Sequence, residues 1–282
     1  EDDLSQMLED ELIAVVEDQI PPLLEDILQA LELSESFEVL GNTYTLSADP
    51  SSVAVDDNGI NLGLRANVSA ANWLLSDTGE GSLFADYSPP SFPSNSSVNI
   101  GLSIDVVNQL LYQVWGGGSI GQELTLSELG LDSDELDLLF PDATDLRVTI
   151  EPLLPPVAVP DGSDLELQIG DLYIALHNGA YATNDIRMEL FVHVFSDLQL
   201  SASASSISAT LGTTDTYFDV VYPQQGSSSA ASVLEELVPL LLPSLTEAIG
   251  SIELPSFQDF SITNVSSSLN GGLLQLSGTL SN

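Results

Sequence analysis

The sequence predicts an α+β fold in which an antiparallel β-sheet covers apolar helices. Segments 4–33 and 231–252 repeat apolar residues at three- and four-residue steps, which is the spacing of one face of an α-helix. Between residues 146 and 194, apolar and polar residues alternate, as in strands with one buried and one wet face. The 231–252 segment is apolar on most sides of its predicted helix, so it needs a cover, and the long apolar face of a sheet is a suitable one.

The N-terminal part is predicted to be a helix followed by strands. Pro21-Pro22 should kink the helix over 4–33 or divide it in two. Residues 37–85 are strand-like, with a turn at Asp57-Asn58-Gly59 between two alternating runs. The segment Asp86–Val98 is rich in proline and serine, which is typical of a linker or of a crossing at the edge of a sheet.

The rest of the chain is predicted to contain two more helices and a series of strands. A second helix runs from Ile104 to Trp115, where Gly116-Gly117-Gly118 ends it. An acidic loop over 129–145 follows, and a third helix covers about 231–252. Alternation predicts strands over Leu146–Ile150, Leu165–Ile169, Leu172–Leu176 and Ile186–Val194, and further strands between Phe257 and Leu280.

The first and third predicted helices resemble each other. A shift of 221 residues aligns their apolar positions and brings Pro22 onto Pro243. Each is followed by Ser-Phe, at Ser36-Phe37 and Ser256-Phe257, and then by strands that an Asn-Gly pair interrupts. The shared order of elements predicts an internal duplication whose unit is a module or half a module.

The charge of the chain excludes several classes of function. It has 43 acidic and 3 basic residues, a net charge of −40, and its only cations are Arg65, Arg147 and Arg187. Binding to nucleic acid needs several cations to neutralise phosphates, so we expect no nucleic-acid partner. No apolar stretch reaches the roughly 18 residues of a membrane span. The chain has no cysteine, which excludes disulfides and thiolate chemistry.

The C-terminal segment resembles a known family. Residues 231–282 are similar to the closing segment of bactericidal/permeability-increasing-type proteins of the tubular lipid-binding (TULIP) superfamily, in which a long proline-containing apolar helix leads into a strand pair. The matching positions are Leu254-Pro255-Ser256-Phe257, Phe260, Asn264 and Leu274-Gln275-Leu276. Residues 100–118 resemble the helix that opens the second module of that family, with Asn108 at its Asn position.

The resemblance implies a highly curved antiparallel sheet wrapped around long apolar helices, with a tunnel for lipid acyl chains. It covers 100–282 best and reaches 1–85 only through the internal repeat. We therefore expect a complete second module over 99–282, and the closing half of a first module plus the linker over 1–98. The mammalian members use basic tips and a disulfide, which this chain does not have. An apolar tunnel does not depend on either.

Two patterns indicate catalysis, and each has a simpler interpretation. Gly117-Gly118-Ser119-Ile120-Gly121 fits the G-x-S-x-G pattern of serine hydrolases, but that serine should follow a strand and open a helix. Here the pattern follows a helix, so a glycine helix terminator is the better explanation. The two histidines, His177 and His193, have no second histidine at ligand spacing and are expected on the surface.

Two further features have open alternatives. The densest acidic cluster is Asp132, Asp134, Glu135 and Asp137, with Asp142 and Asp145. It does not fit the EF-hand template, so a solvated loop is the default and a low-affinity calcium site is the alternative; no metal site is predicted. Aromatic residues at helix ends are usually core, yet Trp115 lies at the mouth-like end of the second helix and is a candidate ligand contact.

The leading hypothesis is a non-enzymatic lipid carrier that holds acyl chains in an apolar tunnel and needs no cofactor. We expect it to be secreted or located in the periplasm or outer envelope, since the absence of cysteine and the acidic composition are compatible with such media. The predicted lipid-binding residues come from the second helix, the strands and the third helix: Val107, Leu110, Leu111, Val114, Trp115, Val148, Leu167, Ile174, Leu190, Val192, Leu237, Leu241 and Leu245.

Alternatives to the carrier remain open. The first is a structural or adhesion module of the cell envelope with the same sheet and a filled core, and a serine-type lipid hydrolase is a distant third. The expected partner is a lipid or another apolar small molecule. Peripheral membrane contact without a basic patch, and a homo-oligomer formed through the partial first module, are further alternatives.

Overall fold

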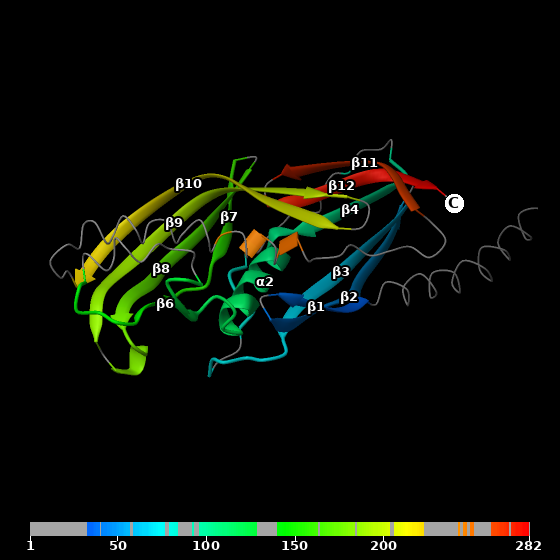
Figure 1. Cartoon of the computed structure of the whole chain (residues 1–282). Helices are drawn as coiled ribbons and strands as arrows, with labels where there is room; N and C mark the ends of the chain where they lie inside the picture. The colour runs from blue at the N-terminus through cyan, green and yellow to red at the C-terminus, as the bar shows by residue number, and fades with distance from the viewer. Residues whose placement is uncertain are drawn as a thin grey trace, which may run out of the picture.

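The computed structural model describes residues 33–39, 41–56, 59–76, 79–83, 92, 96–128, 140–162, 164–183, 185–203, 206–222, 242, 245–246, 249–250, 261–270 and 272–281. These residues form twelve strands in three antiparallel sheets, one continuous α-helix and one short 3₁₀ helix. Figure 1 shows the helix, α2, lying between the sheets.

The predicted architecture, a highly curved sheet wrapped around long apolar helices, is wrong for the described residues. Their one continuous helix is α2 (Ile104–Gly116) of 13 residues, and strands predominate. A helix of this length spans about 20 Å, whereas a strand of 15 to 17 residues spans about 50 Å, so the strands set the dimensions. The predicted helix over 4–33 lies outside the described residues. Within 231–252 only Leu242, Leu245-Thr246 and Ile249-Gly250 are described, and they have helical backbone.

The first sheet is a meander of β1 (Leu33–Val39), β2 (Asn42–Asp56) and β3 (Gly59–Ala70). Asp56 pairs with Gly59, so the hairpin between β2 and β3 turns at the predicted place. The pairing shifts register between Pro50 and Ser52, where proline has no N–H to donate to the ladder.

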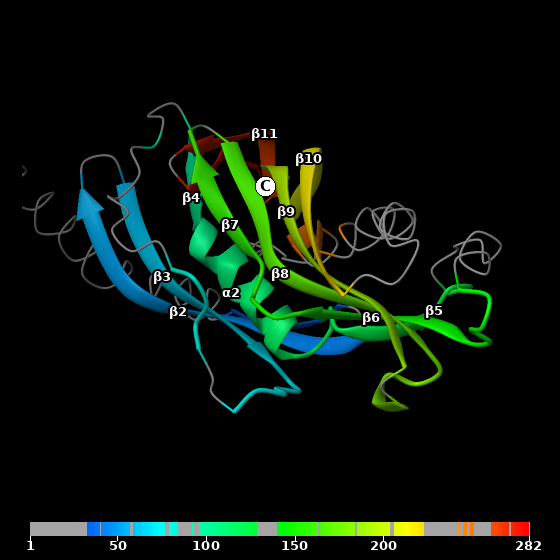
Figure 2. The same ribbon diagram turned by 90° about the vertical axis from the view of Figure 1, so that its left-hand side faces the viewer.

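The second sheet has the strand order β10-β9-β8-β6-β5, and β7 also pairs with β8. Its members are β5 (Gln122–Thr125), β6 (Leu146–Pro152), β7 (Val157–Asp161), β8 (Asp164–Asn178), β9 (Ile186–Ala202) and β10 (Ile207–Tyr222), and the 3₁₀ helix η1 (Tyr181–Thr183) lies between β8 and β9. Figures 1 and 2 show that its long strands are curved and pass beside the helix.

One strand replaces two predicted ones in β8. The pairing with β9 shifts register between Ile169 and Leu172, and Asp171 has a φ of 47°. This bulge inserts an extra residue, which moves the inward positions from odd numbers to even numbers without a break in the strand. As a result, Leu165 and Leu167 face the core together with Leu172 and Ile174.

The third sheet joins the two ends of the 99–282 region. Its order is β11 (Ser261–Asn270), β12 (Leu273–Ser281) and β4 (Val98–Ser103), and Leu274 pairs with Leu102. β4 runs directly into α2, whose N-cap is Ser103: the Ser103 hydroxyl accepts a hydrogen bond from the Asp105 amide at 3.1 Å. The chain's C-terminal strands therefore hold the start of the helix.

A single apolar core connects the helix with all three sheets. Val107, Leu110, Leu111 and Val114 of α2 are fully buried, as the predicted apolar face requires. They cluster with Tyr44 of β2, with the inward residues of β6, β8 and β9, with Leu274 of β12, and with the helical positions Leu242, Leu245 and Ile249. No helix among the described residues is long and apolar enough to cross a membrane.

Candidate functional site

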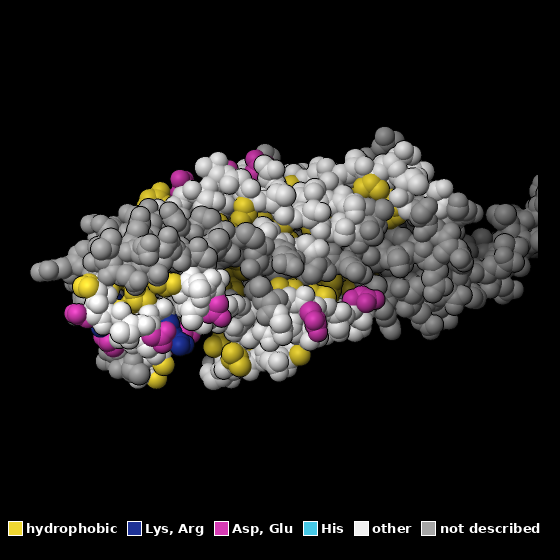
Figure 3. All heavy atoms as spheres, in the orientation of Figure 1, with side chains coloured by type: hydrophobic (Ala, Val, Ile, Leu, Met, Phe, Trp, Pro, Cys, Tyr) yellow, Lys and Arg dark blue, Asp and Glu magenta, His cyan; other side chains and the backbone are white. Residues whose placement is uncertain are grey.

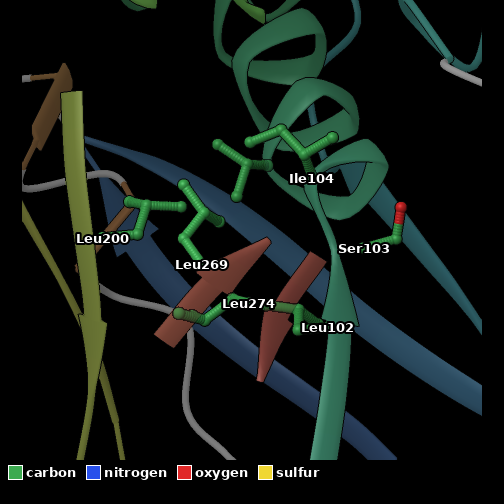
Figure 4. A pocket seen from close by; sticks show the side chains of 7 residues that line it. Leu102, Ser103, Ile104, Leu200, Leu269 and Leu274 are labelled. Atoms are coloured by element: carbon green, nitrogen blue, oxygen red, sulfur yellow. The ribbon is translucent and has the colours of Figure 1, made fainter. Parts of the chain in front are cut away.

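An apolar seam lies where the start of α2 meets β9 and the third sheet. It is lined by Leu102, Ser103, Ile104, Val107, Leu200, Leu269 and Leu274. Figure 4 shows the leucine side chains of β9, β11 and β12 grouped beside Ile104, while the Ser103 oxygen points away from them. The seam does not admit a sphere the size of a water molecule.

The seam is a boundary between two sheets. β11 and β12 belong to one hydrogen-bonded sheet and β9 to another, and among the described strands no ladder joins the two. The sheets nevertheless lie against each other here, because β9 contacts both β11 and β12. Side chains such as Leu200 and Leu269 therefore close the boundary.

The predicted lipid-binding residues are buried together in the core. Val148, Leu167, Ile174, Leu190 and Val192 have no exposed surface, and Leu245 is almost fully buried. Among the described members of the predicted set, only Val107 lines the seam. Leu237 and Leu241 lie outside the described residues. Contact of this set with a lipid stays a prediction.

Sequence reasoning missed most of the seam. Leu200 continues the inward alternation of β9, but Ser196 interrupts the apolar pattern before it. Ser196 is buried because its hydroxyl bonds the Thr214 hydroxyl at 2.8 Å, so the inward face continues past it. The signal that could have identified Leu200 is its position: it lies an even number of residues after the inward-facing Val194, on the same face of the strand as Ser196.

Trp115 lies at the other end of α2 from the seam. Its indole N–H donates to the Pro152 carbonyl at 2.7 Å, and its ring lies 5.5 Å from that of Tyr112. Tyr112 in turn lies 5.4 Å from the ring of Trp73. We call Trp73, Tyr112 and Trp115 the aromatic ladder.

Ser119 is a buried structural contact. Its Oγ accepts a hydrogen bond from Asn42 Nδ2 at 2.6 Å and lies 2.5 Å from the Tyr44 hydroxyl, so it fastens the end of α2 to β2. Burial raises the pKa of Tyr44, and the hydrogen bond to Ser119 opposes that shift. No histidine is among the described partners of Ser119. Backbone bonds of Gly117 and Gly118 to the last turn, with φ of 73° at Gly118, confirm the glycine helix terminator.

The two histidines differ in burial. His193 is part-exposed and lies 3.8 Å from an Asp171 carboxylate oxygen, as a surface residue would. The surface prediction is wrong for His177, which is fully buried. The Gly179 carbonyl can only accept, so His177 Nδ1 donates to it at 2.7 Å, while Nε2 meets the Thr149 hydroxyl at 2.9 Å. These two bonds, together with the Tyr181 ring packed edge-on, make burial of the imidazole tolerable.

The acidic cluster is only partly described, because residues 129–139 lie outside the described residues. Asp145 pairs with Arg147, which also reaches Glu123. Arg187 pairs with Asp185, whose pKa is lowered by its hydrogen bonds with Asn178 and Arg187. Arg65 lies in β3, away from the ends of that strand. Within the described part of the chain, no three His, Asp or Glu residues are grouped as a metal site.

Comparisons with known proteins give loose structural likenesses. No family model matches the chain, and no curated protein matches its sequence. Its structure is similar to a lipopolysaccharide binding protein at a TM-score of 0.47 and 15% identity, covering all of this chain and 63% of that one. P47 of Clostridium botulinum E1 matches at a TM-score of 0.36 and 10% identity over 86% of this chain and 80% of that chain. P47 of Clostridium botulinum A2 matches at a TM-score of 0.40 and 12% identity, over 84% of this chain and 61% of that chain.

The chain therefore spans less than two thirds of the lipopolysaccharide binding protein that it resembles. Scores and identities this low do not carry the activity of one protein to another. What the chain binds is inferred from its own residues.

Proposed function

We propose that the protein is a non-enzymatic carrier of the TULIP type that takes up lipid acyl chains through the apolar seam, in a secreted or envelope location. The observation that carries this proposal is the lining of the seam. Of the seven described residues that line it, six are apolar, and Ser103, the seventh, already caps the helix. A site of this composition attracts hydrocarbon and offers no charge to a polar headgroup.

The narrowness of the seam is consistent with a site that opens to load. Among the described residues, side chains alone join β9 to the third sheet, so these two sheets can separate there without loss of a backbone hydrogen bond. Each methylene that then leaves water for the opened seam contributes about 0.8 kcal/mol, so a long chain gains enough to hold the seam apart.

Charge supports recognition of the hydrocarbon part of a lipid. Arg147 and Arg187 are paired with carboxylates in strands of the second sheet. Neither lines the seam. An anionic headgroup therefore finds no cation there, and the proposal does not extend to lipopolysaccharide.

One observation favours a second function, a structural or adhesion module with a filled core. The seam does not admit a water-sized sphere, and the residues around it are close-packed. A cavity that never opens would leave the protein without a ligand.

Lipid occupancy separates the two functions. The protein would be analysed by native mass spectrometry and organic extraction, and then titrated in delipidated form with a fluorescent fatty acid. We expect bound acyl chains, and a loss of affinity of tenfold or more in Leu200→Trp, which fills the seam. Val221→Trp, at a strand position that is 54% exposed, is the control and should bind as the wild type does. An empty protein that takes up no fatty acid would establish the structural module.

The absence of catalysis has its own test at Ser119. We expect no hydrolysis of model esters by the wild type, and fatty-acid affinity in Ser119→Ala equal to that of the wild type. A burst of ester cleavage that disappears in Ser119→Ala would overturn the non-enzymatic part of the proposal and leave lipid binding standing.

A further inference from the structure

Large apolar side chains are exposed at the C-terminal end of α2, away from the seam. Leu74 and Leu75 follow β3 and are 71% and 40% exposed, and Leu153 and Leu154 follow β6 and are 44% and 48% exposed. We call these four residues the leucine patch. In Figure 1 the segment after β3 projects below the lower end of α2, and Figure 3 shows hydrophobic atoms along the same edge.

The aromatic ladder connects the two halves of the leucine patch. On one side, Trp73 precedes Leu74, whose amide donates to the Gly116 carbonyl at 3.0 Å. On the other side, the Trp115 indole donates to Pro152, which precedes Leu153. Tyr112 packs against both tryptophan rings. The patch is therefore anchored on the C-terminal end of α2, beside aromatic residues that are themselves only partly buried.

Charge selects the partner of this surface. Residues 71–83 and 151–156, which carry the patch, contain the exposed carboxylates Glu80 and Glu151 and no Lys or Arg. An anionic lipid surface would be repelled, and a second copy would bring a further charge of −40 to the contact. A surface that offers hydrocarbon together with quaternary ammonium groups fits both features, because carboxylates and aromatic faces attract such groups. Tryptophan and tyrosine also favour the boundary between lipid and water.

We propose that the leucine patch and the aromatic ladder dock the protein onto neutral, choline-bearing lipid surfaces. The inference rests on the proposed function in one respect, since a carrier of acyl chains must meet a membrane to load or unload. Docking occurs at the end of α2 opposite the seam, so the two surfaces can be altered separately.

The test uses tryptophan emission, because Trp73 and Trp115 are the only tryptophans of the chain and both belong to the ladder. Pure phosphatidylcholine vesicles would be added to the full chain, and emission and flotation measured together. We expect a blue shift, co-flotation, and quenching by lipids brominated near the headgroup. Replacing part of the phosphatidylcholine with phosphatidylserine should weaken binding at low salt.

The decisive variant is the double substitution Leu74→Ser with Leu154→Ser. We expect vesicle affinity to fall by about tenfold or more, since two leucines leave the lipid. Val53→Ser with Val221→Ser removes two apolar side chains of similar exposure elsewhere and should leave binding unchanged. Circular dichroism would confirm that both variants fold.

The docking proposal would be overturned if the wild type did not bind phosphatidylcholine vesicles, or if the patch variant bound them as well as the wild type does. Binding that becomes stronger when anionic lipid is added would overturn it too. A dimer in sedimentation that the patch variant abolishes would also overturn it, by assigning the surface to a second copy. Loading of fatty acid from cyclodextrin, with no vesicle present, tests the carrier function independently. We expect the patch variant to take up fatty acid as the wild type does. A protein that binds vesicles but never takes up fatty acid would refute the carrier function and leave the docking proposal standing.

Discussion

Asn108 completes the free edge of β7 with its side chain. Its Nδ2 donates to the Ala158 carbonyl at 3.0 Å, and its Oδ1 accepts from the Ala158 amide at 2.7 Å. A residue of α2 thus imitates the next strand of the ladder, at a position that is 1% exposed. β7 pairs only with β8 among the described strands, so this amide replaces the partner strand that its other edge does not have.

Asn108→Ala should be among the most destabilising substitutions in the helix. It leaves both backbone groups of Ala158 buried without partners, at about 1–3 kcal/mol each. We expect urea unfolding to show a loss of about 2–6 kcal/mol in the free energy of unfolding. Gln109→Ala is the matched control, because the Gln109 side chain accepts from the Val68 amide in a part-buried place and its loss should be about 1 kcal/mol. Equal effects of the two substitutions would contradict the ladder interpretation.

At the scale of elements, the position of α2 depends on the close approach of Trp73 to the end of the helix. A Cβ added at Gly116 would lie 2.1 Å from atoms of the Trp73 ring. The glycine at this place therefore does two things. It is the last residue of the helix, directly before the cap at Gly117, and it makes room for the ring that starts the aromatic ladder.

Gly116→Ala should displace Trp73 and destabilise the protein by about 1–3 kcal/mol, which exceeds the gain of up to about 1 kcal/mol from the better helix propensity of alanine. Urea unfolding and tryptophan emission would measure both effects. Gly121→Ala is the control, because its added Cβ would meet its nearest atoms at 3.7 and 3.9 Å. An unchanged emission spectrum in Gly116→Ala would show that the ring does not depend on this space.

The elements differ in how far the sequence predicts them. α2 and β6 have an unbroken apolar period, and β9 has one except at Ser196, so their existence and most of their buried faces follow from the pattern. β10 was not predicted, because its inward positions change from odd to even numbers between Leu211 and Thr214. The same kind of bulge made β8 look like two strands. Alternation identifies straight strands and does not survive an inserted residue.

The seam could not be predicted for a different reason. Its lining comes from β4, α2, β9, β11 and β12, and no local pattern indicates that residues near 102 lie beside residues near 270. The sequence predicts which residues are buried, whereas the place where two sheets meet without hydrogen bonds depends on their packing in space.

At the scale of the whole molecule, charge repulsion opposes folding. The chain has 43 carboxylates and 3 arginines, two of which are held in ion pairs on strands of the second sheet. Most carboxylates therefore have no cation within reach, and compaction brings them closer together.

Salt should therefore stabilise the protein. Between about 0.01 M and 1 M salt the screening length falls from about 30 Å to about 3 Å, so repulsion between surface carboxylates is largely removed. We expect the thermal midpoint to rise by several degrees with sodium chloride, with most of the rise complete below about 0.2 M because screening saturates. Sucrose at matched osmolality is the control and should give no such early rise. A midpoint that is flat or falls with salt would contradict the repulsion.

The places of the three arginines have a consequence for proteolysis. Enzymes of the trypsin class cut after arginine or lysine, and this chain has no lysine. Arg65, Arg147 and Arg187 each lie within a paired strand, in β3, β6 and β9. A protease needs a free extended segment, which these residues offer only when their ladders open. The folded chain should resist this whole class of enzyme, and a fragment that ends at one of the arginines would identify the sheet that opened first.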